Sequence, residues 1–147
     1  MKSAFSFART PRLVFGTGSI ARLPELVSQF GTRILLVTGV RALQSSGHWQ
    51  DLVGGLQRVG VILEHIPVSS EPSPHLVDEA VAALRPKGVQ VVVAVGGGSA
   101  IDAGKAISAM LPEHESVVAF LEGVGDPARH RGRSPLRGGT HHGGHRQ

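Results

Sequence analysis

The chain contains no cysteine, which excludes disulfide bonds, thiolate metal ligands and thiol nucleophiles. It has no tyrosine and a single tryptophan, so it lacks the aromatic platforms typical of proteins that bind single-stranded nucleic acid. No apolar run approaches the roughly 18–20 residues that a membrane-spanning helix needs, and the first residues show no apolar segment of a secretion signal. We therefore expect a cytoplasmic protein with no membrane partner.

The net positive charge of the chain lies near its end. Residues 1–125 carry ten Lys and Arg against ten Asp and Glu, whereas residues 126–147 carry five arginines against one aspartate. The net charge of +4 therefore comes from the last segment and not from a basic face on a folded domain, which argues against nucleic acid as a partner. A length of 147 residues is enough for one domain with its own core.

The apolar pattern predicts an α/β fold. Short strand-like runs cover residues 34–37, 61–66 and 91–95, and they alternate with helical patterns at residues 19–30, 48–59 and 74–84. Such alternation predicts a Rossmann-like parallel sheet with helices on both faces. Ligands of these folds bind at the carboxyl ends of the strands, where Thr38, Gly39 and residues 96–99 are expected.

The most informative stretch is the valine-rich strand that ends in Gly96, Gly97, Gly98 and Ser99. We expect Ser99 to be the N-cap of the helix that follows. Glycines let a ligand approach the backbone closely, and the start of a helix favours an anion such as a phosphate. The same glycines also suit a tight turn with no ligand, and the stretch matches neither the G-x-G-x-x-G pattern nor the Walker loop.

The whole string Gly-Gly-Gly-Ser-x-x-Asp-x-x-Lys-x-Ile, behind its valine strand, resembles the iron-containing (group III) alcohol dehydrogenases. Three further segments support this resemblance: residues 15–26, like the family's opening strand pair and first helix, residues 33–39, like its first nucleotide-fold strand, and residues 71–81, like a loop and helix before the glycine turn. The resemblance implies a dehydroquinate synthase-like N-terminal domain that binds NAD(P). It also implies oxidation of an alcohol to an aldehyde or ketone by hydride transfer to that cofactor.

Within that family the glycine turn holds the cofactor's pyrophosphate, which assigns Gly96, Gly97, Gly98 and Ser99 to cofactor binding. Asp102 matches a family aspartate that lies close to the cofactor, but it also suits a first-turn carboxylate that complements the helix dipole. Lys105 matches a family lysine and is equally suited to an ion pair with Asp102.

Gly39 departs from NAD-preferring relatives, which often carry an aspartate after the first strand. A carboxylate there would repel a 2′-phosphate, so glycine slightly favours NADP over NAD. Arg41 is a candidate partner for that phosphate and equally suits an ordinary solvated surface position.

The family's metal, iron or zinc, is held by a C-terminal helical domain. None of His48, His65, His75 and His114 matches a family ligand, so no catalytic or metal residue is expected here. The histidines at 141, 142 and 145 are a candidate metal tract or an accidental run.

We expect residues 1–121 to form the nucleotide-binding domain and residues 122–147 to form a disordered tail. GC-rich codons permitted for residues 137–146, read one base forward, encode Ala-Val-Val-Pro-Thr-Thr-Ala-Gly-Thr-Gly, which resembles the family's next segment. The hypothesis is a frameshift near Gly125, and the gene sequence tests it.

The expected function is therefore that of an NAD(P)-dependent alcohol dehydrogenase that is inactive as this chain alone. The alternative is a non-catalytic nucleotide-binding or interaction module. Loss of the metal domain would also expose an apolar face, so self-association is expected.

Overall fold

The computed structural model describes residues 12, 14–40, 47–121 and 123–124, and the structural statements below refer to these residues. In chain order the helices and strands are η1 (Ser19–Arg22), α1 (Leu23–Ser28), β1 (Arg33–Gly39), α2 (His48–Arg58), β2 (Ile62–Val68), α3 (Pro74–Leu84), η2 (Arg85–Lys87), β3 (Val91–Val95), α4 (Gly98–Met110) and η3 (Val117–Phe120), where η marks a 3₁₀ helix. The predicted alternation of strands and helices is confirmed.

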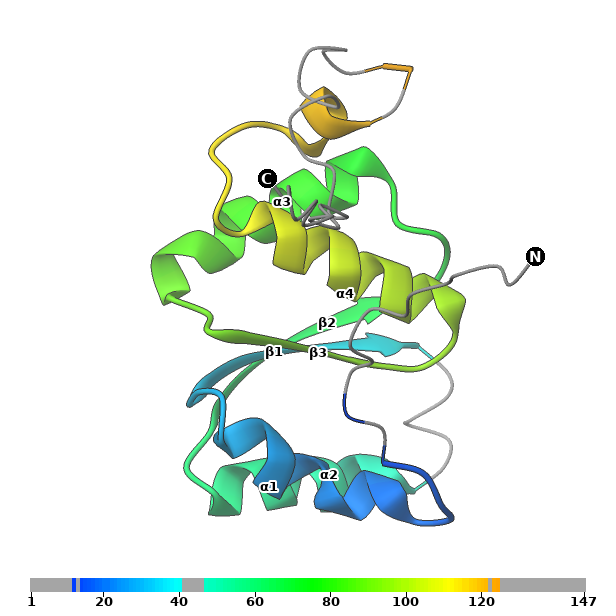
Figure 1. Cartoon of the computed structure of the whole chain (residues 1–147), viewed down its shortest axis with the longest axis vertical. Helices are drawn as coiled ribbons and strands as arrows, with labels where there is room; N and C mark the ends of the chain where they lie inside the picture. The colour runs from blue at the N-terminus through cyan, green and yellow to red at the C-terminus, as the bar shows by residue number, and fades with distance from the viewer. Residues whose placement is uncertain (1–11, 13, 41–46, 122, 125–147) are drawn as a thin grey trace, which may run out of the picture.

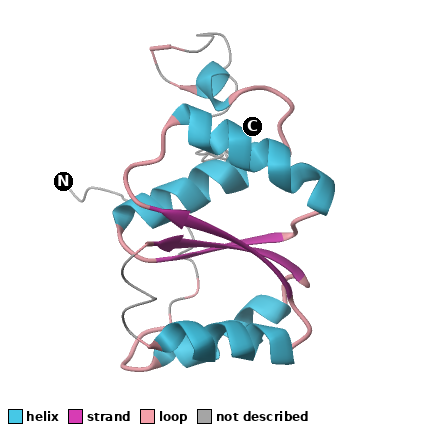
Figure 2. Cartoon of the chain, turned by 180° about the vertical axis from the view of Figure 1, so that it is seen from behind, coloured by secondary structure: helices cyan, strands magenta, loops and turns pink. Residues whose placement is uncertain are grey.

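The three strands form one parallel sheet in the order β2-β1-β3, with β1 at its centre. Figure 2 shows the strand arrows running in the same direction. Helices α1 and α2 cover one face, and α3 and α4 cover the other (Figure 1). The predicted α/β class, with helices on both faces of a parallel sheet, is therefore confirmed.

The core is built on β1, whose central position explains its continuous apolar sequence. Because side chains alternate along a strand, Ile34 and Leu36 pack with the α1–α2 layer, and Leu35 and Val37 pack with the α3–α4 layer. All four side chains are completely buried. This arrangement fixes β1 between the two helical layers and sets the position of its carboxyl end.

Capping and proline residues explain where α3 and α1 begin. Helix α3 follows Ser73, whose hydroxyl accepts a hydrogen bond from Leu76 N (3.2 Å), and it opens with Pro74. The pattern at residues 19–30 is divided into η1 and α1, because Pro24 in the first turn of α1 suits the start of a helix. Strand β2 reaches Val68, two residues beyond the predicted run.

The prediction that Ser99 caps α4 is wrong. The N-cap is Gly97, no side chain caps the helix, and Gly98 is its first residue. The reason is the backbone of Gly96, whose φ of 152° turns the chain within one residue. Gly97 is then already extended (φ −78°, ψ −171°) and the chain enters the helix at Gly98.

Two further predictions concern the end and the opening of the chain. The predicted tail, residues 122–147, lies outside the described residues except for residues 123 and 124. The opening segment at residues 15–26 is described, and it contains η1 and the start of α1 but not the expected strand pair, because no strand precedes η1 in residues 14–18. Within the described ranges, no helix is both long and apolar enough to cross a membrane.

Candidate functional site

A cleft of about 440 Å³ lies at the carboxyl ends of the strands, where α4 begins. It is lined by Gly39, Val40, Val68, Ser69, Gly97, Gly98, Ser99 and Ala100. These residues come from the ends of β1 and β2 and from the start of α4, which is the place where doubly wound α/β folds bind ligands. The structure therefore brings together Gly39 and the glycine turn, which lie far apart in the sequence.

Gly96 has a structural role beside this cleft. A Cβ atom on Gly96 would lie 3.1 Å from the backbone nitrogen of Gly39 and 3.1 Å from the Cβ of Ala100. Its φ of 152° is also a conformation that residues with side chains rarely adopt. The fold itself thus requires glycine here, because the ends of β3 and β1 come so close.

Gly97 and Gly98 differ from Gly96 in having open space around them. A Cβ atom on either would meet nothing within 4 Å, and both residues are exposed. Packing within the described chain therefore does not require glycine at these two positions. Because these glycines have no side chain, a ligand in the cleft can approach their backbone closely.

The start of α4 supplies the hydrogen-bond donors of the site. The carbonyl of Gly97 accepts the first helical hydrogen bond, from Ile101 N at 3.2 Å. The N–H groups of Gly98, Ser99 and Ala100 precede that bond and have no carbonyl partner within the helix. Together with the positive end of the helix dipole, they suit an anionic group in the cleft.

Gly39 lines the same cleft at the end of β1. The end of β1 is held to β2 by a hydrogen bond from Val40 N to the carbonyl of Val68 (3.2 Å). A Cβ atom on Gly39 would meet nothing within 4 Å, so a larger side chain fits there. Arg41, the other residue predicted to read the ribose, lies outside the described residues.

Asp102 is an exposed residue on α4 and does not line the cleft. Because the helix begins at Gly98, Asp102 is its fifth residue, so the interpretation as a first-turn carboxylate is wrong. Its carboxylate lies 3.6 Å from Lys105 Nζ, one turn further along the helix. This exposed ion pair is the interaction that the structure records for both residues.

A polar pair lies next to the site at the end of β1. Thr38, which is 2% exposed, has its hydroxyl oxygen 2.9 Å from His65 Nε2. The imidazole of His65 also packs against the indole of Trp49, with ring centroids 4.6 Å apart. Partial burial lowers the pKa of His65 below its ordinary value of 6.5. These contacts connect β1, β2 and α2 beside the cleft.

Sequence reasoning missed four lining residues: Val40, Val68, Ser69 and Ala100. Val68 and Ser69 follow the same rule that singled out Gly39, since they stand where a parallel strand ends. They were missed because the predicted run ended at residue 66, before Pro67. Ala100 was missed because the helix was expected to begin later.

The described residues do not fit a catalytic metal. Within the described part of the chain, no three histidine, aspartate or glutamate side chains are grouped so that they could hold an ion. His75 instead pairs with Glu79 (3.2 Å) on the exposed face of α3. The histidines at 141, 142 and 145 lie outside the described residues.

Known proteins with similar sequences are dehydrogenases and reductases. The chain is 34% identical to a probable NADH-dependent butanol dehydrogenase 1 of Bacillus subtilis over 107 residues, which are 71% of this chain and 27% of that protein. It is 32% identical to a maleylacetate reductase of Sphingobium indicum over 68% of this chain and 27% of that protein. The chain thus spans about a quarter of the length of these relatives.

Solved structures and a family model agree with these relatives. A halo-thermophilic archaeal alcohol dehydrogenase from a Red Sea brine pool superimposes with a TM-score of 0.76 at 28% identity, covering 86% of this chain and 34% of that one. NADH-dependent butanol dehydrogenase A of Thermotoga maritima gives 0.72 at 26% identity, covering 81% and 31%. The model of the iron-containing alcohol dehydrogenases matches residues 10–136. This chain therefore belongs to the iron-containing alcohol dehydrogenase family.

Proposed function

We propose that this chain is the nucleotide-binding part of an NAD(P)-dependent alcohol dehydrogenase. The observation that carries the proposal is the start of α4, where free N–H groups and two glycines with open space face the cleft. The pyrophosphate of a dinucleotide is the anion of suitable size and charge for that position. The relatives named as NADH-dependent butanol dehydrogenases support the same cofactor.

In this proposal the chain's residues bind and orient the cofactor. The N–H groups of Gly98 and Ser99 donate to pyrophosphate oxygens, and Gly97 keeps the approach open. Gly39 lies where the ribose of the adenosine would reach the end of β1. The bound nicotinamide ring supplies the chemistry, because it accepts a hydride from the carbon of an alcohol. The described residues hold no metal site, so we derive no step through iron or zinc.

Calorimetric titration of the full chain with NADP and with NAD tests this proposal. We expect weak binding, with a Kd of roughly 100 μM or higher. The chain spans about a quarter of its relatives' length, and two or three fewer hydrogen bonds to the cofactor than in a longer relative would reduce affinity by about a hundredfold. Gly97→Val should abolish the measured heat, since a branched side chain would stand where the phosphates approach. Gly54→Val is the matched control, because Gly54 also has open space but lies on α2 away from the cleft. Equal heats for wild type and Gly97→Val would contradict the assignment.

We also propose that NADP is favoured over NAD. Position 39 offers no carboxylate to repel a 2′-phosphate, and Arg41 follows two residues later. Gly39→Asp should move the preference toward NAD by about tenfold or more, since a carboxylate repels the 2′-phosphate and accepts from the ribose hydroxyls. The open space around Gly39 accommodates the new side chain. An unchanged ratio of the two affinities would contradict this preference.

A second candidate is a nucleotide-binding or interaction module without catalysis. It is favoured by the described residues, among which no three side chains are grouped so that they could hold a catalytic metal. An assay of alcohol oxidation with added iron or zinc, run beside the titration, separates the two. Turnover of 1-butanol supports the dehydrogenase, whereas cofactor binding without turnover supports the module. With either function we propose that copies of the chain self-associate.

A further inference from the structure

We propose that His65, through Thr38, positions the carboxyl end of β1 for the adenosine part of the cofactor. Thr38 is the last residue but one of β1, and the two residues after it, Gly39 and Val40, line the cleft. His65 does not line the cleft, so it is a positioning residue that acts through Thr38. The inference rests on the proposed function, which places the ribose of the adenosine at Gly39.

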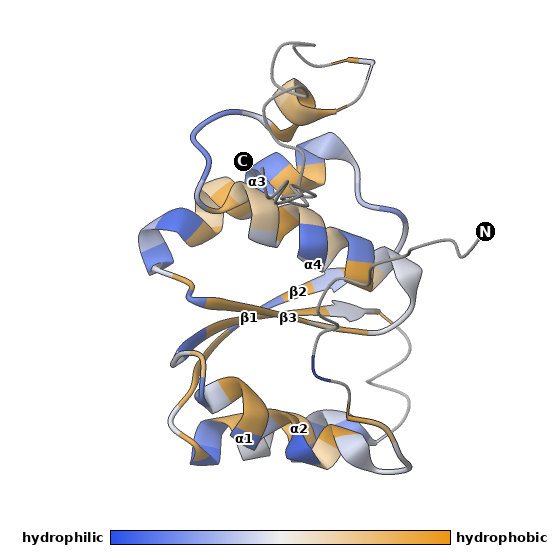
Figure 3. Cartoon of the chain, viewed as in Figure 1, coloured by the Kyte–Doolittle hydropathy of each residue, from blue (hydrophilic) through white to orange (hydrophobic). Residues whose placement is uncertain are grey.

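Thr38 carries a buried hydroxyl group, which needs a partner. Thr38 is the one polar residue among the buried residues that the structure describes. Removing a hydroxyl group from water is unfavourable unless the group is hydrogen-bonded. Its partner is the imidazole of His65, whose Nε2 atom lies 2.9 Å from the hydroxyl oxygen. In Figure 3 the arrowhead of β1 is nearly white, which marks the change from apolar residues at this end of the strand.

The bond between the two side chains runs diagonally from β1 to β2. His65 is opposite Leu36 in the register of the two strands, and Thr38 lies two residues further toward the cleft. Because side chains alternate along a strand, all three point to the α1–α2 layer, where Leu36 packs. The bond therefore connects the end of β1 to β2 in addition to the main-chain pairing of the strands.

The imidazole of His65 is in turn held by α2. Trp49 is the second residue of that helix, and its ring centroid lies 4.6 Å from the imidazole centroid, with the two planes tilted by 50°. Both side chains are half-buried, so the indole limits the orientations that the imidazole can adopt. The support that Thr38 receives therefore comes from two elements, β2 and α2.

The position of this strand end matters because a dinucleotide would contact two parts of the cleft at once. In the proposed function its pyrophosphate binds at the start of α4, and its ribose lies at Gly39 on β1. Groups that bind one ligand together have to be held within about 0.5 Å of the productive geometry, which is done by the side chains behind them. The bond between Thr38 and His65 is such a support for Gly39.

Hydrogen exchange at Val40 tests the positioning directly, followed by nuclear magnetic resonance in the full chain without cofactor. Val40 N donates to the carbonyl of Val68 at 3.2 Å, and both residues line the cleft. His65→Leu keeps an apolar side chain but removes the ring nitrogen, so the exchange rate of Val40 should rise about tenfold. His65→Gln should stay within about threefold of the wild-type rate, because an amide can still bond to Thr38.

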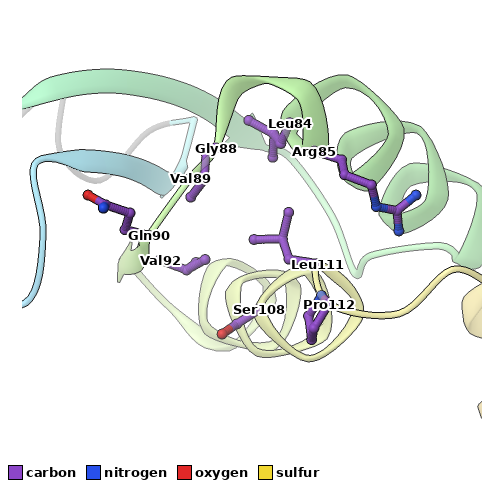
Figure 4. A pocket seen from close by; sticks show the side chains of 9 residues that line it. All are labelled: Leu84, Arg85, Gly88, Val89, Gln90, Val92, Ser108, Leu111 and Pro112. Atoms are coloured by element: carbon purple, nitrogen blue, oxygen red, sulfur yellow. The ribbon is translucent and has the colours of Figure 1, made fainter.

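The control amide is Gln90 N, which donates to the carbonyl of Arg33 (2.8 Å) at the amino ends of the strands. Gln90 lies beside a hollow of about 320 Å³ between α3 and α4, away from the cleft (Figure 4). Its exchange rate should stay within about threefold of wild type in every variant. An unchanged rate at Val40 in His65→Leu would overturn the inference. Equal rises at Val40 and Gln90 would overturn it too, because they would indicate a loss of overall stability.

Thr38→Val is the second variant, since valine keeps the shape of threonine without the hydroxyl group. It should raise the exchange rate of Val40 as much as His65→Leu does. Combining the two changes should add nothing further, because both remove the same bond. A double variant whose effect is the product of the two single effects would overturn the inference. Either single variant decides the exchange test if the other does not fold.

Titration with two ligands shows whether this position serves the adenosine part. His65→Leu should weaken NADP binding about tenfold and leave the binding of inorganic pyrophosphate unchanged, because pyrophosphate has no ribose. His65→Gln should recover the affinity for NADP. An equal loss for both ligands, or a loss for neither, would overturn the inference. A wild type that binds neither ligand would contradict the proposed function instead, and the exchange rate of Val40 would then decide the role of His65.

Discussion

At the residue scale, neighbouring glycines in the turn after β3 have different roles. Gly96 allows the backbone of β3 to approach Gly39 at a φ of 152°, whereas Gly97 has ordinary extended geometry and open space. From the sequence alone, the three glycines of the turn cannot be told apart. The structure separates the glycine that the fold requires from the glycines that leave a ligand room.

This difference predicts effects of different size for two alanine substitutions. Gly96→Ala should lower the free energy of unfolding by about 1–3 kcal/mol, because its Cβ would crowd the Gly39 backbone in a strained conformation. Gly97→Ala should change it by less than about 0.5 kcal/mol, since the site is open and exposed. Urea unfolding followed by circular dichroism measures both. Equal losses for the two variants would show that the turn does not have this geometry.

The imidazole of His65 predicts a dependence of stability on pH. Burial lowers the pKa of His65 below 6.5, so the unfolded chain takes up a proton more readily than the folded chain. The stability that the neutral ring contributes is fully present above the pKa of His65 in the unfolded chain. It is lost as the pH falls from there through the lower pKa of His65 in the folded chain. The free energy of unfolding should therefore decrease as the pH is lowered from about 7 to about 5.

His65→Gln should reduce this decrease, because an amide can still bond to Thr38 but does not titrate in this range. His75→Gln, which removes an exposed imidazole on α3, is the control for the general loss of a histidine. Urea unfolding at the two pH values gives the comparison. A slope that is the same in His65→Gln and wild type would rule out this role for His65.

At the element scale, close packing of α4 on β3 positions the start of that helix at the cleft. A Cβ atom on Gly104 would lie 2.8 Å from the Cβ of Ala94. Two small residues thus let the helix lie directly against the strand, and the position of Gly98 at the cleft depends on this contact.

Gly104→Ala should therefore destabilise the chain by roughly 1–3 kcal/mol, the usual cost of overpacking a core. Gly54→Ala is the matched helical control, because nothing lies within 4 Å of its Cβ position. It should stabilise the chain by about 0.5–1 kcal/mol, the gain of alanine over glycine within a helix. Thermal unfolding measures both changes, and destabilisation by both substitutions would contradict the packing argument.

The sequence predicted the type and order of the main elements, because strongly apolar runs such as β1 leave little choice of structure. The predicted bounds of α3 and β3 agree with the structure. The carboxyl end of β2 was missed because Pro67 interrupts the apolar pattern, and proline is tolerated here since β2 is an edge strand of the described sheet. The N-cap of α4 was missed because propensity favours serine, whereas the sharp turn at Gly96 starts the helix earlier.

At the scale of the whole molecule, the described residues form a three-layer α/β unit with a cleft at the carboxyl ends of the strands. The sequence predicts a set of cofactor residues: Gly39, Arg41, Gly96, Gly97, Gly98, Ser99 and Asp102. Of these, the structure places Gly39 and residues 97–99 together around the cleft. The sequence could not identify Val68 and Ser69 as lining residues, because their place at the cleft depends on how β2 lies beside β1.

The central claim, that the start of α4 binds the pyrophosphate of a dinucleotide, is tested most directly by nuclear magnetic resonance. A ¹⁵N-labelled full chain is titrated with NADP while its backbone amide signals are followed. We expect the largest shifts at Gly97, Gly98 and Ser99, with smaller ones at Gly39, and none at Gly88 and Gln90 beside the hollow of Figure 4. Shifts that saturate elsewhere while the amides of Gly97–Ser99 stay unchanged would contradict it.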